Sequence, residues 1–107
     1  MQVGLPLPLG GNAIRRALGP DVIGRASQAM RDSIAHGLAH RDDAIAWLLE
    51  RGGPLATHAE VDHYLSLYAN DDTLDYGEDG RTAIQELIRR GRAAGLLPDC
   101  PPVDFAP

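Results

Sequence analysis

Lysine is absent from the 107 residues, so all ten basic side chains are arginines, and they are scattered along the chain. Fifteen acidic residues bring the formal net charge to −5. Proteins that bind nucleic acid usually concentrate basic residues in a patch or stripe. Because this chain has a negative balance and no such cluster, we expect no nucleic-acid partner.

Cysteine occurs once, at Cys100, so no disulfide can form within the chain, and the composition suits a reducing compartment. No apolar run approaches the ~20 residues that a membrane span requires. Met1 is not followed by the basic segment and apolar core of a signal peptide. These absences predict a cytoplasmic protein with no membrane partner.

The length and the 44% hydrophobic content are those of one ordinary globular unit, 1–107, and no internal repeat is visible. The only biased segment is the end of the chain, where residues 97–107 contain four prolines. We divide the unit into an extended part (1–18), a helical part (20–96) and this proline-rich tail (97–107).

An extended segment opens the chain. In Gly4–Gly11, GLPLPLGG, three leucines fall on one side of an extended backbone, with Pro6 and Pro8 on the other. The prolines remove two amide donors from one edge, which excludes a central strand. An edge strand, a polyproline-like segment, the wall of a cavity and a plain connector all remain open. Asn12–Leu18 is either a short strand or the lead-in to a helix, closed by Gly19.

Helical periodicity begins after this segment. A first amphipathic helix is predicted over about 20–39, with proline at its start. A second is predicted over about 41–51, capped by His40 or Asp42, with Trp47 as its apolar anchor.

A third helix is predicted over about 58–69. Thr57 and Glu60 have the spacing of a capping box, in which each side chain accepts a hydrogen bond from the backbone of the other. The polar stretch 70–74 then joins this helix to the next.

The fourth helix is the best defined, over about 76–94. Asp75 and Glu78 have capping-box spacing, and Gly95 supplies the left-handed residue that commonly follows a helix. One face of this helix is apolar and the rest is charged.

Gly80 and Gly91 lie inside this last helix, where glycine costs about 1 kcal/mol relative to alanine. Such a cost is easier to bear where another backbone approaches closely, so we expect a partner against this face. The fold class is therefore mainly α, with about four amphipathic helices after one extended segment. A lone strand cannot make a sheet, so the segment either lies across the helices or pairs with chain that is not present in this sequence.

Histidines give no convincing metal site. His36 and His40 stand four apart, a spacing at which two imidazoles can share zinc. The metalloprotease pattern requires glutamate after the first histidine, and here that residue is Gly37. His58 and His63 are five apart and do not share a helical face. We expect no metal and interpret His40 as a helix cap and His36 as a solvated side chain.

The acidic stretch Asn70–Glu78 is not a calcium loop, because the obligatory glycine and glutamate positions fall on Tyr76 and Thr82. We interpret it as a polar turn that caps the following helix. Neither Ser33 nor Cys100 has an evident base, so no catalytic residue is assigned.

Several pieces of the chain occur in an order that we recognise. They are GLPLPLG at Gly4–Gly10, Arg15-Arg16 before Leu18-Gly19, Arg31 with Ser33 and Ile34, Tyr68-Ala69-Asn70, Leu74–Gly80, and the closing Gly95-Leu96. In this order they resemble the 1,4-dihydroxy-6-naphthoate synthases of the futalosine route to menaquinone. The sister chorismate dehydratases fit these pieces less well.

This resemblance implies a lyase that converts cyclic dehypoxanthinyl futalosine to 1,4-dihydroxy-6-naphthoate without a metal or redox cofactor. Members of that family are well over twice this length and fold as two α/β lobes, like periplasmic binding proteins, with the small-molecule substrate between the lobes. The resemblance implies that this chain is a C-terminal fragment whose partner is the missing N-terminal part. The family's proposed catalytic histidine lies in that part.

In the complete protein we expect Leu7, Pro8, Leu9 and Gly10 to border the substrate cleft, because the prolines forbid ladder pairing and glycine lets a ligand approach the backbone. Two alternatives remain open. One is the C-terminal part of a solute-binding protein that catalyses nothing. The other is a free-standing helical interaction module that self-associates to bury its apolar stripes.

Overall fold

The computed structural model describes residues 3–107, and it is mainly helical, as the sequence predicts. Its elements in chain order are the 3-10 turn η1 (Arg16–Leu18), α1 (Gly19–Ala39), α2 (Arg41–Glu50), α3 (His58–Tyr68), α4 (Asp71–Leu74) and α5 (Gly77–Ala93). Over residues 3–107 no segment forms a β-strand, so the opening segment is extended but unpaired. The four predicted long helices are present, and the polar joint adds the short α4.

The lead-in to α1 is a helical turn rather than a strand. Gly19 has φ of +83°, a conformation that other residues rarely adopt, and it lets the chain pass from η1 into α1. Pro20 then occupies the first turn, where its missing amide hydrogen has no intrahelical partner to lose.

The helices α2 and α3 form a hairpin around two buried side chains. Ile45 of α2 is 0% exposed and Val61 of α3 is 4% exposed. The prediction that Trp47 anchors α2 is wrong, because this side chain is 51% exposed and the Arg51 guanidinium stacks 3.8 Å from its ring centre. Residues two apart on a helix point roughly 200° apart, so burial of Ile45 turns Trp47 away from α3.

The predicted capping box at the start of α3 is confirmed. The Thr57 hydroxyl accepts a hydrogen bond from the Glu60 amide at 3.2 Å, and the Glu60 carboxylate accepts from the Thr57 amide at 3.0 Å. The amide of Ala56 donates to the same carboxylate at 2.9 Å. These backbone hydrogen bonds lower the pKa of Glu60.

The predicted capping box at Asp75 and Glu78 does not form. Asp75 closes α4 with its backbone, and α5 begins at Gly77, so Glu78 is the second rather than the third helical residue. The Asp75 carboxylate accepts from the Gly77 amide at 2.9 Å, and it therefore still satisfies one free donor at the helix start. Gly77 has φ of +65°, which makes this sharp entry possible.

The end of α5 is a Schellman motif built on Gly95, which has φ of +72°. The Gly95 amide donates to Arg92 O at 2.9 Å and the Leu96 amide to Gly91 O at 2.9 Å. This confirms the predicted helix end to within one residue.

The partner expected at Gly80 and Gly91 comes from the flanks of the same helix. A Cβ atom on Gly91 would lie 2.7 Å from Leu97 Cδ1, and one on Gly80 would lie 2.9 Å from Tyr76 Cβ. The two glycines make room for the residues that enter and leave α5. The expectation of a separate element against this face is not met within residues 3–107.

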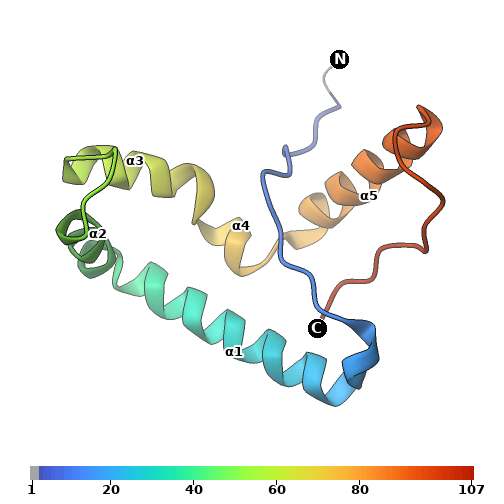
Figure 1. Ribbon diagram of the computed structural model, residues 1–107, viewed down its shortest axis with the longest axis horizontal. Helices are drawn as coiled ribbons and strands as arrows, with labels where there is room; N and C mark the ends of the chain where they lie inside the picture. The colour runs from blue at the N-terminus through green and yellow to red at the C-terminus, as the bar shows by residue number, and fades with distance from the viewer. Residues whose placement is uncertain (1–2) are drawn as a thin grey trace.

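Figure 1 shows an open frame, with α1 along one side, the α2–α3 hairpin at one corner and α5 on the opposite side. The radius of gyration is 16.7 Å, whereas a compact domain of about 100 residues has a value of about 13 Å. The hydrophobic side chains recorded as buried in the described part of the chain are Ile45, Val61 and Ala83. The fold therefore has a small core in the hairpin and little burial elsewhere.

Candidate functional site

The predicted cleft residues lie on the extended segment that crosses the frame between α4 and α5 (Figure 1). Leu7 and Leu9 are 75% and 56% exposed, whereas Pro8 between them is partly buried. A Cβ atom on Gly10 would meet nothing within 4 Å, so the backbone is open to solvent there. The structure thus presents these side chains on a free surface and encloses no cavity with them.

Just beyond this segment, the chain meets the first turn of α5. A Cβ atom on Gly11 would lie 3.4 Å from the hydroxyl oxygen of Tyr76. The ring of Tyr76 meets Phe105 from the tail edge to face, with 6.4 Å between ring centres. The guanidinium of Arg81 lies 5.9 Å from the Phe105 ring centre and 3.4 Å from Asp75 Oδ1. This cluster joins three parts of the chain that are distant in sequence.

The larger hollow, about 450 Å³, lies between α5 and the tail, away from the leucine-proline segment. Its lining residues are Gln85, Ile88, Arg89, Arg92, Pro101, Pro102 and Val103. Both arginines already have carboxylate partners: Arg89 binds Glu86 through two hydrogen bonds of 2.7 and 2.8 Å, and Arg92 binds Asp99 at 3.0 Å. The hollow is mainly apolar and offers no unpaired cation for an acidic ligand.

The smaller hollow, about 270 Å³, lies where α1 meets α2 and includes His36, His40 and Asp43. The two imidazole rings stack with 4.1 Å between centres, and His40 Nδ1 lies 2.8 Å from His36 O. His40 therefore stands at the N-cap position of α2, as predicted, but its ring caps the end of α1, and α2 has no side-chain cap. Among residues 3–107 no group of three or more potential ligands converges on a metal position.

Arg41 makes the strongest polar contacts in the hairpin. Its guanidinium donates to Asp62 Oδ1 at 2.7 Å, to Asp62 O at 2.9 Å and to Ala69 O at 3.3 Å. The charge-assisted hydrogen bond lowers the pKa of Asp62. Sequence reasoning missed this pair, because the two residues are 21 positions apart on different helices and no local pattern connects them.

The carboxylates with lowered pKa are all bound to arginines or backbone amides. Glu86 is the clearest case, because hydrogen bonds from Arg89 and Arg90 lower its pKa to about 2. A general acid or base needs a pKa near the working pH, so Glu60, Asp62 and Glu86 act as structural anions. Ser33 is exposed, and Cys100 is partly buried in the tail.

The described polar groups therefore form a scaffold with an exposed leucine-proline edge. Residues 1–93 match the family model described as menaquinone biosynthesis, and the chain belongs to that family. The resemblance drawn from the sequence motifs is confirmed by two curated relatives, both 1,4-dihydroxy-6-naphthoate synthases.

The chain is 36% identical over 95 residues to the 1,4-dihydroxy-6-naphthoate synthase of Streptomyces coelicolor, an alignment that covers 89% of the chain and 33% of the relative. It is 35% identical over 100 residues to the one of Thermus thermophilus, with 94% and 36% covered. The chain thus spans about a third of the length of these relatives. No solved structure matches it. In residues 3–107 no helix has both the length and the apolar character to cross a membrane.

Proposed function

We propose that this chain is the C-terminal portion of a two-lobed, periplasmic-binding-protein-like lyase of menaquinone biosynthesis. The reaction is the conversion of cyclic dehypoxanthinyl futalosine to 1,4-dihydroxy-6-naphthoate. The observation that carries the proposal is the similarity to two 1,4-dihydroxy-6-naphthoate synthases along about nine tenths of the chain, although only a third of each relative is covered.

The physical character of the chain supports a portion of a larger protein rather than a free-standing module. Leu7, Leu9, Leu87 and Leu96 are all at least half exposed, and burial is concentrated in one hairpin. Burying a leucine stabilises a fold by about 1.5–3 kcal/mol, so a self-sufficient domain would cover several of these side chains. The remaining two thirds of the protein would supply the missing surface.

In this function Leu7, Pro8, Leu9 and Gly10 form part of the pocket wall. The prolines have no amide hydrogen to donate to a sheet ladder, so a neighbouring strand cannot pair regularly along this edge. Gly10 has open space at its Cα, through which a ligand can approach the backbone. Acid, base and nucleophile would come from the missing N-terminal part, and the chain alone would not turn over the substrate.

The test is reconstitution. The preceding two thirds of the Streptomyces coelicolor relative is expressed together with this chain, and release of 1,4-dihydroxy-6-naphthoate from cyclic dehypoxanthinyl futalosine is measured. Each part alone should be inactive and the pair should be active. Substrate binding without turnover would instead support a solute-binding protein, and release of naphthoate by the lone chain would refute the division of labour proposed.

The pocket-wall assignment is tested with Gly10→Val, with Gly53→Val in the α2–α3 loop as its matched control. A Cβ atom at either glycine meets nothing within 4 Å in this chain, so neither change should alter its helix content. In the reconstituted pair, Gly10→Val should lower kcat/KM by up to about 100-fold by displacing the substrate, whereas Gly53→Val should not. Equal activities of the two variants would remove residue 10 from the cleft.

A further inference from the structure

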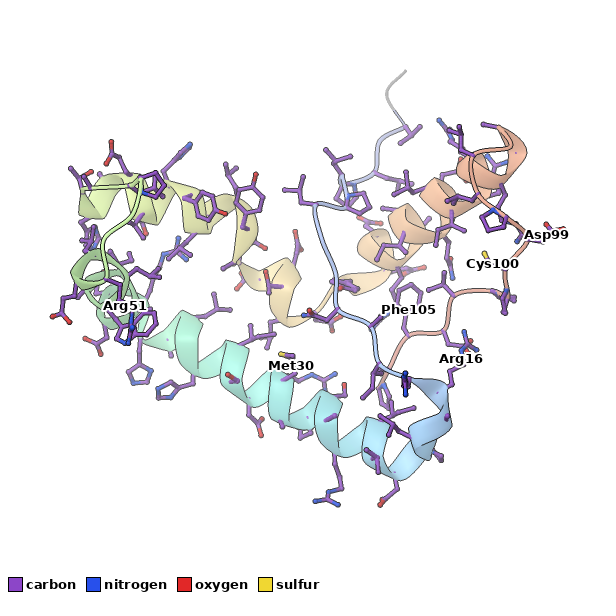
Figure 2. All side chains as sticks on the ribbon, in the orientation of Figure 1. Arg16, Met30, Arg51, Asp99, Cys100 and Phe105 are labelled. Carbon is purple, nitrogen blue, oxygen red and sulfur yellow. The ribbon has the colours of Figure 1, made fainter. Side chains whose placement is uncertain are left out.

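The proline-rich tail folds back across the frame instead of leaving it. After Leu97 has packed on Gly91, the chain runs from the end of α5 toward the start of α1 (Figure 1). Figure 2 shows Asp99 and Cys100 beside the end of α5, and Phe105 and Arg16 near the turn that enters α1. The family match ends at residue 93, so the tail lies outside the segment that it covers.

The end of the tail is tied to the lead-in of α1 by polar contacts. The Asp104 carboxylate pairs with the guanidinium of Arg16, and the same guanidinium donates to Pro102 O at 3.2 Å. The hydroxyl of Ser27 on α1 donates to Pro107 O. These contacts join residues 80 to 88 positions apart in the sequence.

An apolar contact accompanies them. Phe105 is partly buried, although most of the tail is exposed, and its ring lies between Tyr76 and Arg81 at the first turn of α5. Tyr76 in turn approaches Gly11, the residue after the predicted cleft segment. The tail therefore contacts the lead-in to α1 at Arg16 and reaches the end of the leucine-proline segment through Tyr76.

We propose that residues 102–107 are a latch that fixes the segment from Gly10 to Arg16 against the first turn of α5. This segment has no sheet ladder to hold it, so side-chain contacts at its ends determine where it lies. Phe105 and Asp104 are the positioning residues of the latch. Its effect on the substrate cleft rests on the proposed function, whereas its effect on the chain itself does not.

The first test uses the full 107-residue chain and amide hydrogen exchange. Phe105→Ala removes an aromatic and a cation–π contact, so exchange of the Leu18 amide, which donates to Arg15 O at 3.2 Å beside the latch, should accelerate about tenfold. Asp104→Asn weakens one exposed ion pair and should accelerate it about threefold. Asp99→Asn is the matched control, because Asp99 pairs with Arg92 before the latch begins, and it should leave this exchange unchanged.

The α2–α3 hairpin serves as the internal reference in these measurements. A latch predicts faster exchange at Leu18 with unchanged exchange at Ile45 and Val61. Faster exchange everywhere would mean that Phe105 supports the fold in general, and unchanged exchange at Leu18 would mean that the contacts do not restrain the segment. Either result would overturn the latch.

The second test uses the reconstituted pair of parts. Asp104→Asn and Phe105→Ala should raise KM by about threefold to tenfold while kcat stays within about twofold, since they loosen a pocket wall without removing a reacting group. An unchanged KM, or a fall in kcat as large as the rise in KM, would refute the link to the cleft. If the unmodified pair is inactive, the proposed function fails, and the exchange experiment still decides whether the latch exists.

Discussion

The α2–α3 hairpin and the half of the molecule around α5 differ in how much apolar side chain each buries within itself. In the hairpin, Ile45 of α2 and Val61 of α3 are buried, and Arg41 binds Asp62 and the end of α3. On α5, the small side chain of Ala83 is buried, whereas that of Leu87 is 54% exposed. The hairpin thus holds two of the three buried hydrophobic side chains named for residues 3–107, although Trp47, Leu67 and Tyr68 on the same two helices are about half exposed.

Under the proposed function, this difference bears on which surface would contact the preceding part of the protein. Exposed leucines of the opening segment and of α5 include Leu7, Leu9 and Leu87, while Leu48 and Leu67 are exposed on the hairpin. An apolar edge of this extent costs stability in water unless other chain covers it. Because the half around α5 buries only the small Ala83 among the named hydrophobic residues, we expect this half to be the contact surface if the chain is the portion proposed above.

The largest effect should come from supplying that surface. Burying Leu5, Leu7, Leu9 and Ile14 would each contribute about 1.5–3 kcal/mol, comparable in sum with the whole stability of a domain. We expect the lone chain to be helical but loosely packed or self-associated, to bind apolar dye, and to melt cooperatively only with the missing part. Thermal melting and dye binding with and without that part are the measurements. A monomeric lone chain that melts sharply and binds no dye would favour a free-standing module.

Next in size is a cavity in the hairpin. Ile45→Ala should lower the free energy of unfolding by about 2–5 kcal/mol, because Ile45 is fully buried and its neighbours relax only partly. Leu87→Ala should cost little in the lone chain and much more once the missing part is present. Urea denaturation of both variants, alone and reconstituted, separates the two halves. Equal costs in the lone chain would erase the contrast between them.

A smaller effect is expected at the entry to α5. Asp75→Ala removes the acceptor of the Gly77 amide and should destabilise the chain by about 0.5–2 kcal/mol. Asp71→Ala should cost far less, because Asp71 contributes its backbone carbonyl, which accepts from the Asp75 amide at 3.0 Å, and the substitution keeps it. Chemical denaturation decides the matter, and equal costs would show that the Asp75 carboxylate is not the cap of α5.

Local signals in the sequence predicted local structure well. The bounds of α1, the Thr57 and Glu60 box and the Gly95 end of α5 depend on residues within one or two turns of each other, and all are confirmed. The predicted start of α5 is confirmed to within one residue, but the box at Asp75 and Glu78 does not form, because the unforeseen α4 ends at Leu74 and takes Asp75 as its C-cap. Residue spacing alone does not show whether Asp75 ends one helix or caps the next.

Local sequence patterns did not predict the contacts between segments that are distant in the chain. The prediction of Trp47 as the anchor of α2 failed, because tertiary geometry sets which face packs on α3 and it buries Ile45 instead. The tail contact of Arg16 with Asp104 spans 88 residues and that of Phe105 with Tyr76 spans 29, and neither leaves a periodic trace. The assignment of Leu7, Pro8, Leu9 and Gly10 to a cleft comes from proline and glycine chemistry, and their place in a cleft stays a prediction.

The smallest effect we predict concerns the charged face of α5 in acid. Glu86 accepts hydrogen bonds from Arg89 and Arg90, which lower its pKa from the ordinary 4.5 to about 2. A carboxyl group whose pKa is lower in the folded state stabilises that state above its unfolded pKa, and this contribution is lost as the pH falls from about 4.5 toward about 2. The pair is accessible to solvent, so the change in stability should be slight even though the titration is clearly shifted.

Carbon-detected NMR of the Glu86 side chain should therefore show no inflection near pH 4.5. In a chain carrying Arg89→Gln and Arg90→Gln the inflection should return toward that value, while exchange protection in the α2–α3 hairpin stays the same. If Glu86 in the unmodified chain titrates near pH 4.5, then Arg89 and Arg90 do not bind its carboxylate in solution. The hairpin and α5 would then differ in their ion pairs as well as in their apolar contacts. Arg41 and Asp62 would be a well-bound pair in the hairpin, whereas Glu86 would not be bound in this way on α5.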